Sequence, residues 1–489
     1  MKVSISKYNN LNLRINTEDP DYISIMRAEF TRKVQNFRFV PAYRSGKWNG
    51  MVCMIDKWKH TFPYGLLFDF IRIHKKNYPH IKLEIDQDVK NLFIGPELEI
   101  EYDLKLFPRP YQIDCIEGCL EHTKGIIRSS TASGKSLVIA YVIKILLDNK
   151  CIDKAVIIVP SKGLIAQFYQ DLIDYGIDSS IIGMAFSGRK QWDKTILIST
   201  WQTLKNNHDK LDQFQCIIAD ETHGAKAHEL KQILEKGTKA EYRFGFTGTM
   251  HAKSLDNWNT KAFIGPIIRE YPSGLLAEQG WISKCTVNMV NIEYREDFWH
   301  GEYHGIRDLV FQNDYRMRLI KKMVGDLDHN VLVLVDKVEK EGELLKQFLS
   351  NDVNKEVVFL SGKDNIDVRE KWRKECMKRK DICLIATYGI FQVGVNIPNL
   401  KYIVLASPFK AKIRVLQSIG RSLRLHEIKE EEGAQIFDIH DHTKFFEKYG
   451  NVRSRYYESE GFKVEELIFH EGDDLFKDFF PFADHLSSK

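Results

Sequence analysis

This 489-residue chain lacks the sequence features of membrane, secreted, zinc-binding and repeat proteins. No apolar stretch approaches the ~20 residues that cross a bilayer, and the start Met1-Lys2-Val3 lacks the apolar core of a secretion signal. The eight cysteines are scattered without a C-x-x-C pair, which argues against structural zinc and suits a reducing compartment. Low-complexity segments and short repeats are also lacking. We therefore expect a cytoplasmic protein with no membrane partner.

An imbalance of charge is confined to the amino-terminal part of the chain. Residues 1–95 hold 16 Lys and Arg against 9 Asp and Glu, a formal charge of +7. The remainder holds 55 basic and 58 acidic residues and carries −3. A basic module ahead of a near-neutral remainder predicts a polyanionic partner, most simply a nucleic acid.

A phosphate-binding loop is predicted at Ser129–Ser136, which reads Ser-Ser-Thr-Ala-Ser-Gly-Lys-Ser. An apolar strand at 125–128 enters the loop and an apolar helix at 137–147 leaves it, so the amino end of the helix would point N–H groups at a phosphate. The first position is Ser129, where the pattern G-x-x-x-x-G-K-[ST] has glycine. The closing Gly-Lys-Ser and its strand–loop–helix setting predict nucleotide binding.

Two carboxylates supply what such a loop needs. Asp220 and Glu221 follow the apolar run 216–219, at the expected carboxyl end of a strand, where open α/β sheets keep their ligands. In nucleotide hydrolysis a Lys contacts the phosphates, a hydroxyl and an Asp bind Mg²⁺, and a further group orients the attacking water. These roles fall to Lys135, to Ser136 with Asp220, and to Glu221, and they predict a nucleoside triphosphatase.

Buried strands recur after residue 100, separated by amphipathic helices. One series lies at 155–159, 195–199, 216–219 and 243–247, and a second at 331–335, 356–360, 382–386, 402–406 and 435–439. Apolar strands alternating with helices predict parallel sheets covered on both faces. Residues 1–95 instead mix expected helices at 23–34 and 66–74 with strands at 50–55 and 81–85. We expect an α/β protein with domains at 1–95, 96–285 and 286–489.

The order of short motifs resembles the superfamily 2 helicases, and among them the DExH group. Residues 109–112 resemble the adenine-recognition segment; motifs I, Ia, II and III correspond to 130–136, 159–167, 220–223 and 247–249. The later motifs correspond to 360–362, 386–396 and 417–424, with Asn396 where many members have Asp. The resemblance spans about residues 105–440. It implies that 96–285 is an ATP-binding RecA-like motor domain and that 286–489 is a second one with a carboxyl-terminal extension.

The resemblance also implies the residues that act on ATP and Mg²⁺. Those that bind ATP would be Arg109, Gln112, Ser130, Thr131, Ala132, Ser133, Gly134, Lys135, Ser136 and His223. The catalytic set would be Lys135, Asp220, Glu221, Gln417, Arg421 and Arg424. Arg421 and Arg424 lie three apart on an expected helix, so they share a face and could act as arginine fingers. The alternative is that both are surface salt-bridge partners.

Strand contacts are expected from residues 160–162, 200–203 and 386–388. These segments offer hydroxyls, amides and loop N–H groups, which contact phosphates and sugars without reading sequence. Trp201 could stack on a base, and packing in a core suits it equally. The expected contacts are Ser161, Lys162, Thr200, Trp201, Gln202 and Thr387.

The amino-terminal segment 37–50 sets Arg38, Arg44 and Lys47 among aromatic residues, a pattern that combines phosphate contact with stacking. The alternative is that its aromatic residues form the domain core, and for Phe39 and Phe62 we favour the core. With 62–67, this segment resembles the leading domain of the UvsW-type helicases of T-even phages. That resemblance implies a phage protein in the host cytoplasm, which remodels branched DNA by fork regression, branch migration and R-loop unwinding in recombination and replication restart.

Three functions remain open. The first is an ATP-dependent helicase or translocase acting on branched or single-stranded DNA or on an RNA–DNA hybrid. The second is a DExH RNA helicase, which the motor motifs do not exclude. The third is a branched-DNA binding or annealing scaffold with a degenerate ATP site, against which the intact Lys135, Asp220 and Glu221 argue.

The carboxyl-terminal segment 473–482 is acidic and contains four Phe. These aromatic residues would form an unusual apolar patch if exposed, which favours packing on the second motor domain. The alternative is docking into a basic, apolar groove of a single-strand-binding or recombination protein. The motor itself is expected to be a monomer.

Overall fold

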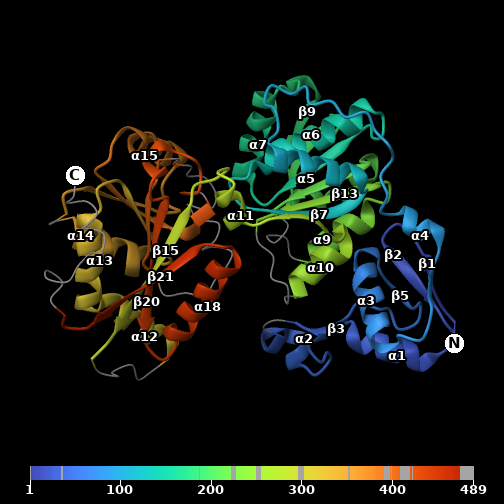
Figure 1. Ribbon diagram of the computed structural model, residues 1–489, viewed down its shortest axis with the longest axis horizontal. Coiled ribbons are helices and arrows are strands. Elements are labelled where there is room, and N and C mark those ends of the chain that lie inside the picture. Colours follow the sequence, from blue (N-terminus) through green and yellow to red (C-terminus); the bar gives the residue numbers. More distant parts are fainter. Residues whose placement is uncertain are drawn as a thin grey trace. The chain divides into compact units, whose positions relative to one another are not determined.

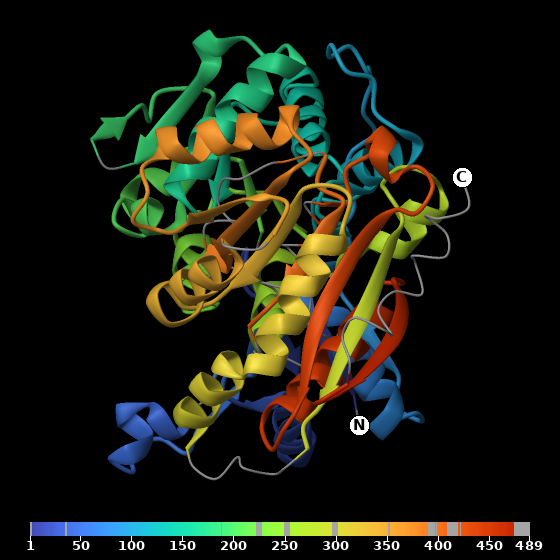
Figure 2. The same ribbon diagram turned by 90° about the vertical axis from the view of Figure 1, so that its left-hand side faces the viewer.

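The computed structural model describes residues 2–34, 37–186, 188–221, 227–248, 255–295, 302–350, 353–389, 397, 399–407, 419–420 and 422–473, with the backbone alone at 227–231, 255–257 and 366. The chain divides into two compact units (Figures 1 and 2). The first takes in the residues up to Ser129 and Gly134–Tyr271, and the second takes in Ser130–Ser133 and the chain from Pro272 onward. No helix in the described ranges is long and apolar enough to cross a membrane.

The first unit begins with a small α+β domain. Its four-stranded sheet has the order β5-β2-β1-β6, in which β1 pairs parallel with β6 and β2 pairs antiparallel with both of its neighbours. The elements are β1 (Val3–Lys7), β2 (Asn12–Asn16), α1 (Pro20–Glu29), β3 (Thr31–Lys33), η1 (Phe37–Phe39), α2 (Pro41–Arg44), β4 (Met51–Cys53), β5 (Thr61–Pro63), η2 (Tyr64–Leu66), α3 (Leu67–Asn77), β6 (Leu83–Ile85) and α4 (Gln87–Asn91).

The helix expected at 23–34 is α1, which begins three residues before the expected start and ends five residues before the expected end. Asp19 caps α1, accepting from the backbone N–H groups of the first turn, and Pro20 suits the first helical position. The chain leaves the helix at the buried Phe30, after which β3 pairs antiparallel with β4. Tertiary pairing thus overrides the helical pattern in the last residues of the expected helix.

The core of this domain contains Phe62 but not Phe39. The ring of Phe62 stacks on that of Phe70, with centroids 4.8 Å apart, and its place in the core is confirmed. The expectation for Phe39 is wrong, because its side chain is 70% exposed. Phe37 fills the local core instead, packing edge-on against Tyr43 with ring centroids 4.6 Å apart.

The rest of the first unit is an eight-stranded sheet of order β10-β9-β11-β8-β12-β13-β7-β14, parallel except at β10. Its elements are α5 (Pro110–Glu121), β7 (Lys124–Ser129), α6 (Lys135–Asp148), β8 (Ala155–Val159), α7 (Lys162–Tyr175), η3 (Ser179–Ile181), β9 (Ile182–Phe186), β10 (Arg189–Lys190), β11 (Ile196–Thr200), α8 (Trp201–Lys205), η4 (His208–Gln213), β12 (Cys216–Asp220), α9 (Ala227–Lys236), β13 (Tyr242–Thr247), α10 (Leu255–Ile264) and β14 (Ile267–Tyr271).

The small domain is packed onto this sheet through its own residues. The Tyr64 hydroxyl donates to the carbonyl oxygens of Phe263 (2.7 Å) and Ile264 (2.8 Å) at the end of α10. Lys261 on α10 pairs with Asp69 on α3 at 2.5 Å. Residues from both parts share one apolar cluster, so the first unit has a continuous core.

The second unit is a seven-stranded parallel sheet of order β17-β18-β16-β19-β20-β15-β21. Its elements are α11 (Ser273–Glu278), β15 (Cys285–Glu293), α12 (Tyr303–Gln312), α13 (Asp314–Asp326), β16 (Val331–Val335), η6 (Val338–Glu343), α14 (Leu344–Leu349), β17 (Glu356–Leu360), α15 (Ile366–Lys378), β18 (Ile382–Thr387), β19 (Tyr402–Leu405), η7 (Glu427–Lys429), β20 (Ala434–His442), α18 (Phe446–Ser459) and β21 (Lys463–His470). The expected fold, two parallel sheets after a small α+β domain, is confirmed.

Candidate nucleotide and nucleic-acid sites

The predicted phosphate loop joins β7 to α6 and turns on two left-handed residues. Ala132 has φ 72° and Gly134 has φ 73°. The φ of Gly134 favours glycine there, and an added Cβ would also lie 2.5 Å from Nε2 of Gln112, so the Gln112 amide would have to shift. A non-glycine residue such as Ala132 in this region costs about 1–3 kcal/mol, a strain that clusters at ligand sites. The 14-residue helix α6 starts at Lys135 and directs its amino end at the loop.

The loop and the carboxylates leave the sheet at the same edge. Strand β13 lies between β7 and β12, with Thr247 beside Arg128 and Phe246 beside Asp220. Across this edge, Nζ of Lys135 lies 3.7 Å from Oε1 of Glu221. It also donates to the carbonyl oxygen of Ser129 at 3.3 Å. The lysine is therefore already held where a polyphosphate would need its charge.

Asp220 has the environment of a cation ligand. Its Oδ1 atom is closed to solvent and accepts no hydrogen bond from the part of the chain that the structure describes. The pKa of Asp220 is raised to about 7, because burial and the charge of Glu221 together outweigh the opposing charge of Lys135. A buried carboxylate oxygen of this kind, with the Ser136 hydroxyl on the loop, suits the hard oxygen coordination of Mg²⁺.

Sequence reasoning missed Tyr175, the last residue of α7. Its hydroxyl lies 2.7 Å from Oγ of Ser136, and either group can donate. Asp171, one turn earlier on the same helix, contributes to the raised pKa of Asp220. No spacing or motif connects these positions in the sequence, because the contact depends on how α7 crosses α6.

The expected adenine segment lies beside the loop. Gln112 accepts from the backbone N–H of Arg109 at 2.9 Å and donates to the carbonyl oxygen of Gly134 at 3.4 Å. This amide therefore ties the start of α5 to the end of the phosphate loop. Gln112 is buried and Arg109 is half-buried.

Three predicted residues lie outside the described residues: His223, Gln417 and Arg421. The carboxyl-terminal segment from 474 onward does as well. Arg424 is described, and it follows the helical residues 419, 420 and 422 in a bend. Its carbonyl oxygen accepts from the Ser283 hydroxyl at 3.0 Å.

The expected strand contacts of the first unit gather at a second part of the same sheet edge. Val159 and Thr200 end neighbouring strands in register, so Ser161 and Thr200 emerge together. Ser161 is the cap residue of α7, and its Oγ is buried with no hydrogen-bond partner among the residues the structure covers. Lys162 and Gln202 are exposed, whereas the Thr200 hydroxyl caps α8, accepting from the Thr203 N–H at 3.4 Å.

The stacking role considered for Trp201 is wrong. Only 2% of the residue is exposed, and its indole belongs to the apolar cluster beneath the sheet. A base cannot reach either face of this ring, so the core interpretation holds.

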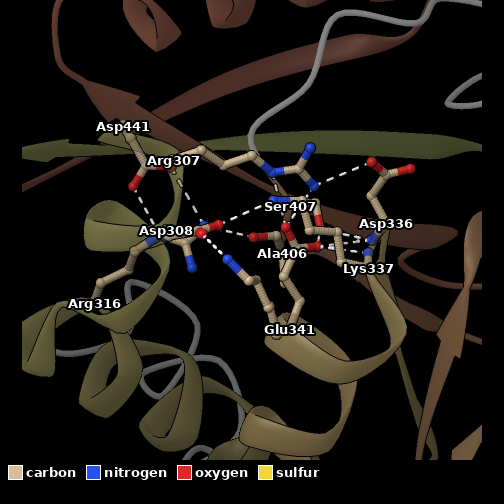
Figure 3. Close-up of polar contacts among 10 residues, drawn as sticks. Arg307, Asp308, Arg316, Asp336, Lys337, Glu341, Ala406, Ser407 and Asp441 are labelled. Atoms are coloured by element: carbon tan, nitrogen blue, oxygen red, sulfur yellow. Dashed lines mark hydrogen bonds and ion pairs between the residues drawn. The ribbon is translucent and has the colours of Figure 1, made fainter. Parts of the chain in front are cut away.

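In the second unit, Thr387 ends β18 beside Val335 of β16, and its side chain is buried. A cluster of buried charges follows at this edge (Figure 3). Arg307 on α12 donates to Oε1 of Glu341 at 2.9 Å and to Asp336 at 3.1 Å. The Oε2 atom of Glu341 accepts from the backbone N–H groups of Asp336 (2.9 Å) and Lys337 (3.0 Å) and from the Ser407 hydroxyl (2.6 Å).

A second buried pair braces the same edge. Nε of Arg316 on α13 donates to Asp441 at 2.8 Å, and its Nη2 donates to the carbonyl oxygen of Ala406 at 2.5 Å (Figure 3). Burial works against the Arg316 charge, but Asp441 holds its pKa above the ordinary value. The segments that follow β16 and β19 are therefore fixed relative to each other and to the end of β20. Sequence reasoning assigned no role to these residues.

The three basic residues predicted in the amino-terminal domain are all exposed. The Arg44 guanidinium carbon lies 5.7 Å from the centroid of the exposed Phe39 ring, and that of Arg38 lies 5.9 Å from the centroid of the Phe37 ring. Lys47 follows in the turn after α2.

Comparison with known proteins agrees with this geometry. Residues 105–252 match the family described as the res subunit of type III restriction enzymes, and 315–426 match the helicase conserved C-terminal domain. The ATP-dependent DNA helicase UvsW of enterobacteria phage T4 is 25% identical over 93% of this chain and 94% of its own length. The DNA 3'-5' translocase XPB2 of Sulfurisphaera tokodaii is 23% identical over 72% of this chain and 88% of its own. The crystal structure of T4 UvsW covers 96% of this chain and 100% of that chain at 23% identity and TM-score 0.50.

With both halves of the motor matched, the chain is a superfamily 2 helicase, an ATP-hydrolysing enzyme that binds nucleic acid. It has the two RecA-like domains of that class. Along nearly its whole length it resembles the T4 helicase UvsW.

Proposed function

We propose that this helicase remodels branched DNA, by fork regression, branch migration and R-loop unwinding, in recombination and replication restart. The observation that carries the proposal is the length of the similarity to UvsW. A match over 93% of the chain leaves out fewer residues than 1–95 contain, so the similarity extends beyond the motor into the basic amino-terminal domain. A motor match alone would favour DNA and RNA equally.

We propose that ATP is hydrolysed at the edge formed by β7 and β12. Lys135 contacts the β- and γ-phosphates, and Glu221 accepts a hydrogen bond from the attacking water. Ser136 and Asp220 would hold Mg²⁺, which when bound offsets the charge of the phosphate oxygens. Gln112 and Arg109 flank the adenine side, and the loop N–H groups of 130–134 surround the phosphates. His223, Gln417, Arg421 and Arg424 complete the proposed set, the arginines acting on charge that develops in the transition state.

Strand contact is proposed at the edges that carry Ser161, Lys162, Thr200 and Gln202 in the first unit and Thr387 in the second. The exposed Lys162 ammonium and Gln202 amide suit a phosphate backbone, so binding by the motor is expected to tolerate any sequence. The hydroxyls of Ser161, Thr200 and Thr387 are buried, and these residues would position the loops at the two edges. Selection of branched DNA is then left to the basic amino-terminal domain.

The test is ATPase activity measured with single-stranded DNA, forked DNA, a four-way junction and RNA at equal nucleotide concentration. The proposal expects the fork and the junction to stimulate most and RNA least. Equal or stronger stimulation by RNA would favour an RNA helicase. Junction binding with no hydrolysis on any substrate would favour a scaffold with a degenerate ATP site.

A further inference from the structure

The excess charge of the amino-terminal domain is concentrated in one short segment. Residues 31–59 hold seven Lys and Arg and one Asp, a formal charge of +6, against +7 for all of 1–95. This segment, the basic hairpin, consists of β3, β4, the η1–α2 insert between them and the turn that follows. Its β3–α2 part projects from the rest of the amino-terminal domain in both views (Figures 1 and 2).

The basic hairpin has a small core of its own. Phe37 packs against Tyr43 and covers Gly50, where an added Cβ would lie 2.6 Å from the Phe37 ring. Gly50 also has φ 80°, which favours glycine. The Trp48 indole donates to the carbonyl oxygen of Met51 at 2.8 Å. Tyr43 and Trp48, the aromatic residues next to Arg44 and Lys47 in the sequence, are thus engaged within the hairpin.

Phe39 is left out of that core. It lies two residues after Phe37 in η1, and 70% of it is exposed. Arg44 lies 5.7 Å from its ring, and Arg38 and Lys47 are exposed in the same insert. At the base of the hairpin, Trp58 is 81% exposed with the Lys57 ammonium 4.8 Å from its ring. Solvent-exposed aromatic rings next to Arg and Lys side chains are typical of surfaces that stack on bases and contact phosphates.

We propose that Phe39 stacks on an unpaired or terminal base at the branch point of DNA, while Arg38, Arg44 and Lys47 contact the flanking phosphates. A base at a branch has an open face, whereas bases inside a duplex are covered by their neighbours, so an aromatic platform discriminates branches without reading sequence. This proposal rests on the proposed function and assigns its branch recognition to one side chain. Trp58 is a second platform at the hairpin base.

Phe39→Ala is the direct test, and Phe68→Ala is its matched control. Phe68 is also exposed (51%), but it lies on α3 outside the basic hairpin. Binding to a fork, a four-way junction, a circular duplex without ends and single-stranded DNA would be measured by fluorescence anisotropy. We expect Phe39→Ala to lose about tenfold in affinity for the fork and junction, as stacking of one base predicts, and little for the duplex. Phe68→Ala should bind like the wild type.

A fluorescent base analogue at the branch point supplies a second readout. The wild type should quench its emission on binding and Phe39→Ala should not, with thermal melting and DNA-free ATPase unchanged in both variants. If Phe39→Ala binds the fork with wild-type affinity and quenches the base analogue as the wild type does, the proposal is wrong. If the wild type itself shows no preference for branches, the proposed function fails, whatever Phe39 does.

Discussion

At the scale of single residues, the ATP site depends on charges held close together in a poorly solvated edge. Asp220 is half-buried beside Glu221, with its Oδ1 atom closed to solvent, and the Lys135 ammonium offsets part of the repulsion between the two carboxylates. Removing one of these charges changes the environment of the others. The ATP site and the strand ends that carry Ser161 and Thr200 occupy different parts of one sheet edge, so hydrolysis and strand binding should be separable by substitution.

Lys135→Ala and Glu221→Gln are expected to abolish ATP turnover and leave DNA affinity within a few-fold of the wild type. The first loses the phosphate contact and the second loses the acceptor for the attacking water. Steady-state ATPase assays and anisotropy binding to single-stranded DNA check this. Hydrolysis at the wild-type rate by either variant would contradict the site.

Tyr175→Phe tests the residue that sequence reasoning missed. If the Ser136 hydroxyl donates to the phenol oxygen, both serine lone pairs stay free for the metal, and the loss of this hydrogen bond should weaken Mg²⁺-dependent nucleotide binding about 2- to 10-fold. Binding of a fluorescent ADP would be titrated with Mg²⁺ and with EDTA. The EDTA value should not change, and Tyr169→Phe on the same helix should match the wild type. An equal effect with and without Mg²⁺ would mean a packing role.

At the scale of elements, buried ion pairs fix the strand ends of the second unit. Arg316 and Asp441 are both fully buried, whereas Arg318, two residues along α13, pairs with Asp314 in solvent, where both side chains are about two-thirds exposed. The same helix therefore offers a buried pair and an exposed control.

Arg316→Met should lower the free energy of unfolding by about 3–5 kcal/mol, because it leaves the Asp441 charge buried without its partner. Arg318→Met should change it by less than about 1 kcal/mol, since exposed pairs contribute little. Urea unfolding followed by circular dichroism measures both. A similar small loss in the two variants would show that the buried pair does not brace the unit.

Lys124, at the start of β7, makes the first unit sensitive to pH. Burial, with help from Arg243, lowers its pKa from 10.5 to about 7. A folded pKa below the unfolded value means that the folded state releases the proton first, so stability rises with pH from about 7 upward. Between pH 7 and 9 the gain is about 2 kcal/mol. Lys124→Met should be more stable than the wild type at pH 7 and lack this gain; parallel pH profiles would contradict the assignment.

The elements show where sequence reasoning succeeds. Strands such as 155–159 and 331–335 were predicted with their bounds, because a buried parallel strand is apolar throughout. The sequence also predicted that Lys135 and Asp220 lie at one edge of the sheet, because the carboxyl ends of parallel strands meet there. The Tyr175–Ser136 contact and the Arg307–Glu341 pair could not be predicted, because each depends on how two segments far apart in the sequence pack against each other. The prediction that Phe39 is a core residue was wrong. The sequence does not distinguish Phe37 from Phe39, and only the fold of the hairpin decides which of the two rings packs inward.

At the scale of the whole molecule, the amino-terminal domain is not an appendage that can be removed cleanly. Ile5 and Phe70 share one apolar cluster with Ile126 and Ile217 of the motor sheet. Deleting residues 1–95 would expose that face, so loss of junction preference in a truncated chain would not separate recognition from instability. Substitutions on the exposed basic hairpin keep the core intact and are the better probe.

The central claim is that ATP hydrolysis drives the rearrangement of branched DNA. Branch migration of a mobile four-way junction, followed by gel electrophoresis with a tailed duplex and a tailed RNA duplex in parallel, tests it most directly. The account predicts ATP-dependent conversion of the junction by the wild type, none by Lys135→Ala, and slower unwinding of both linear substrates. Junction conversion without ATP, or RNA unwinding as fast as junction conversion, would contradict it.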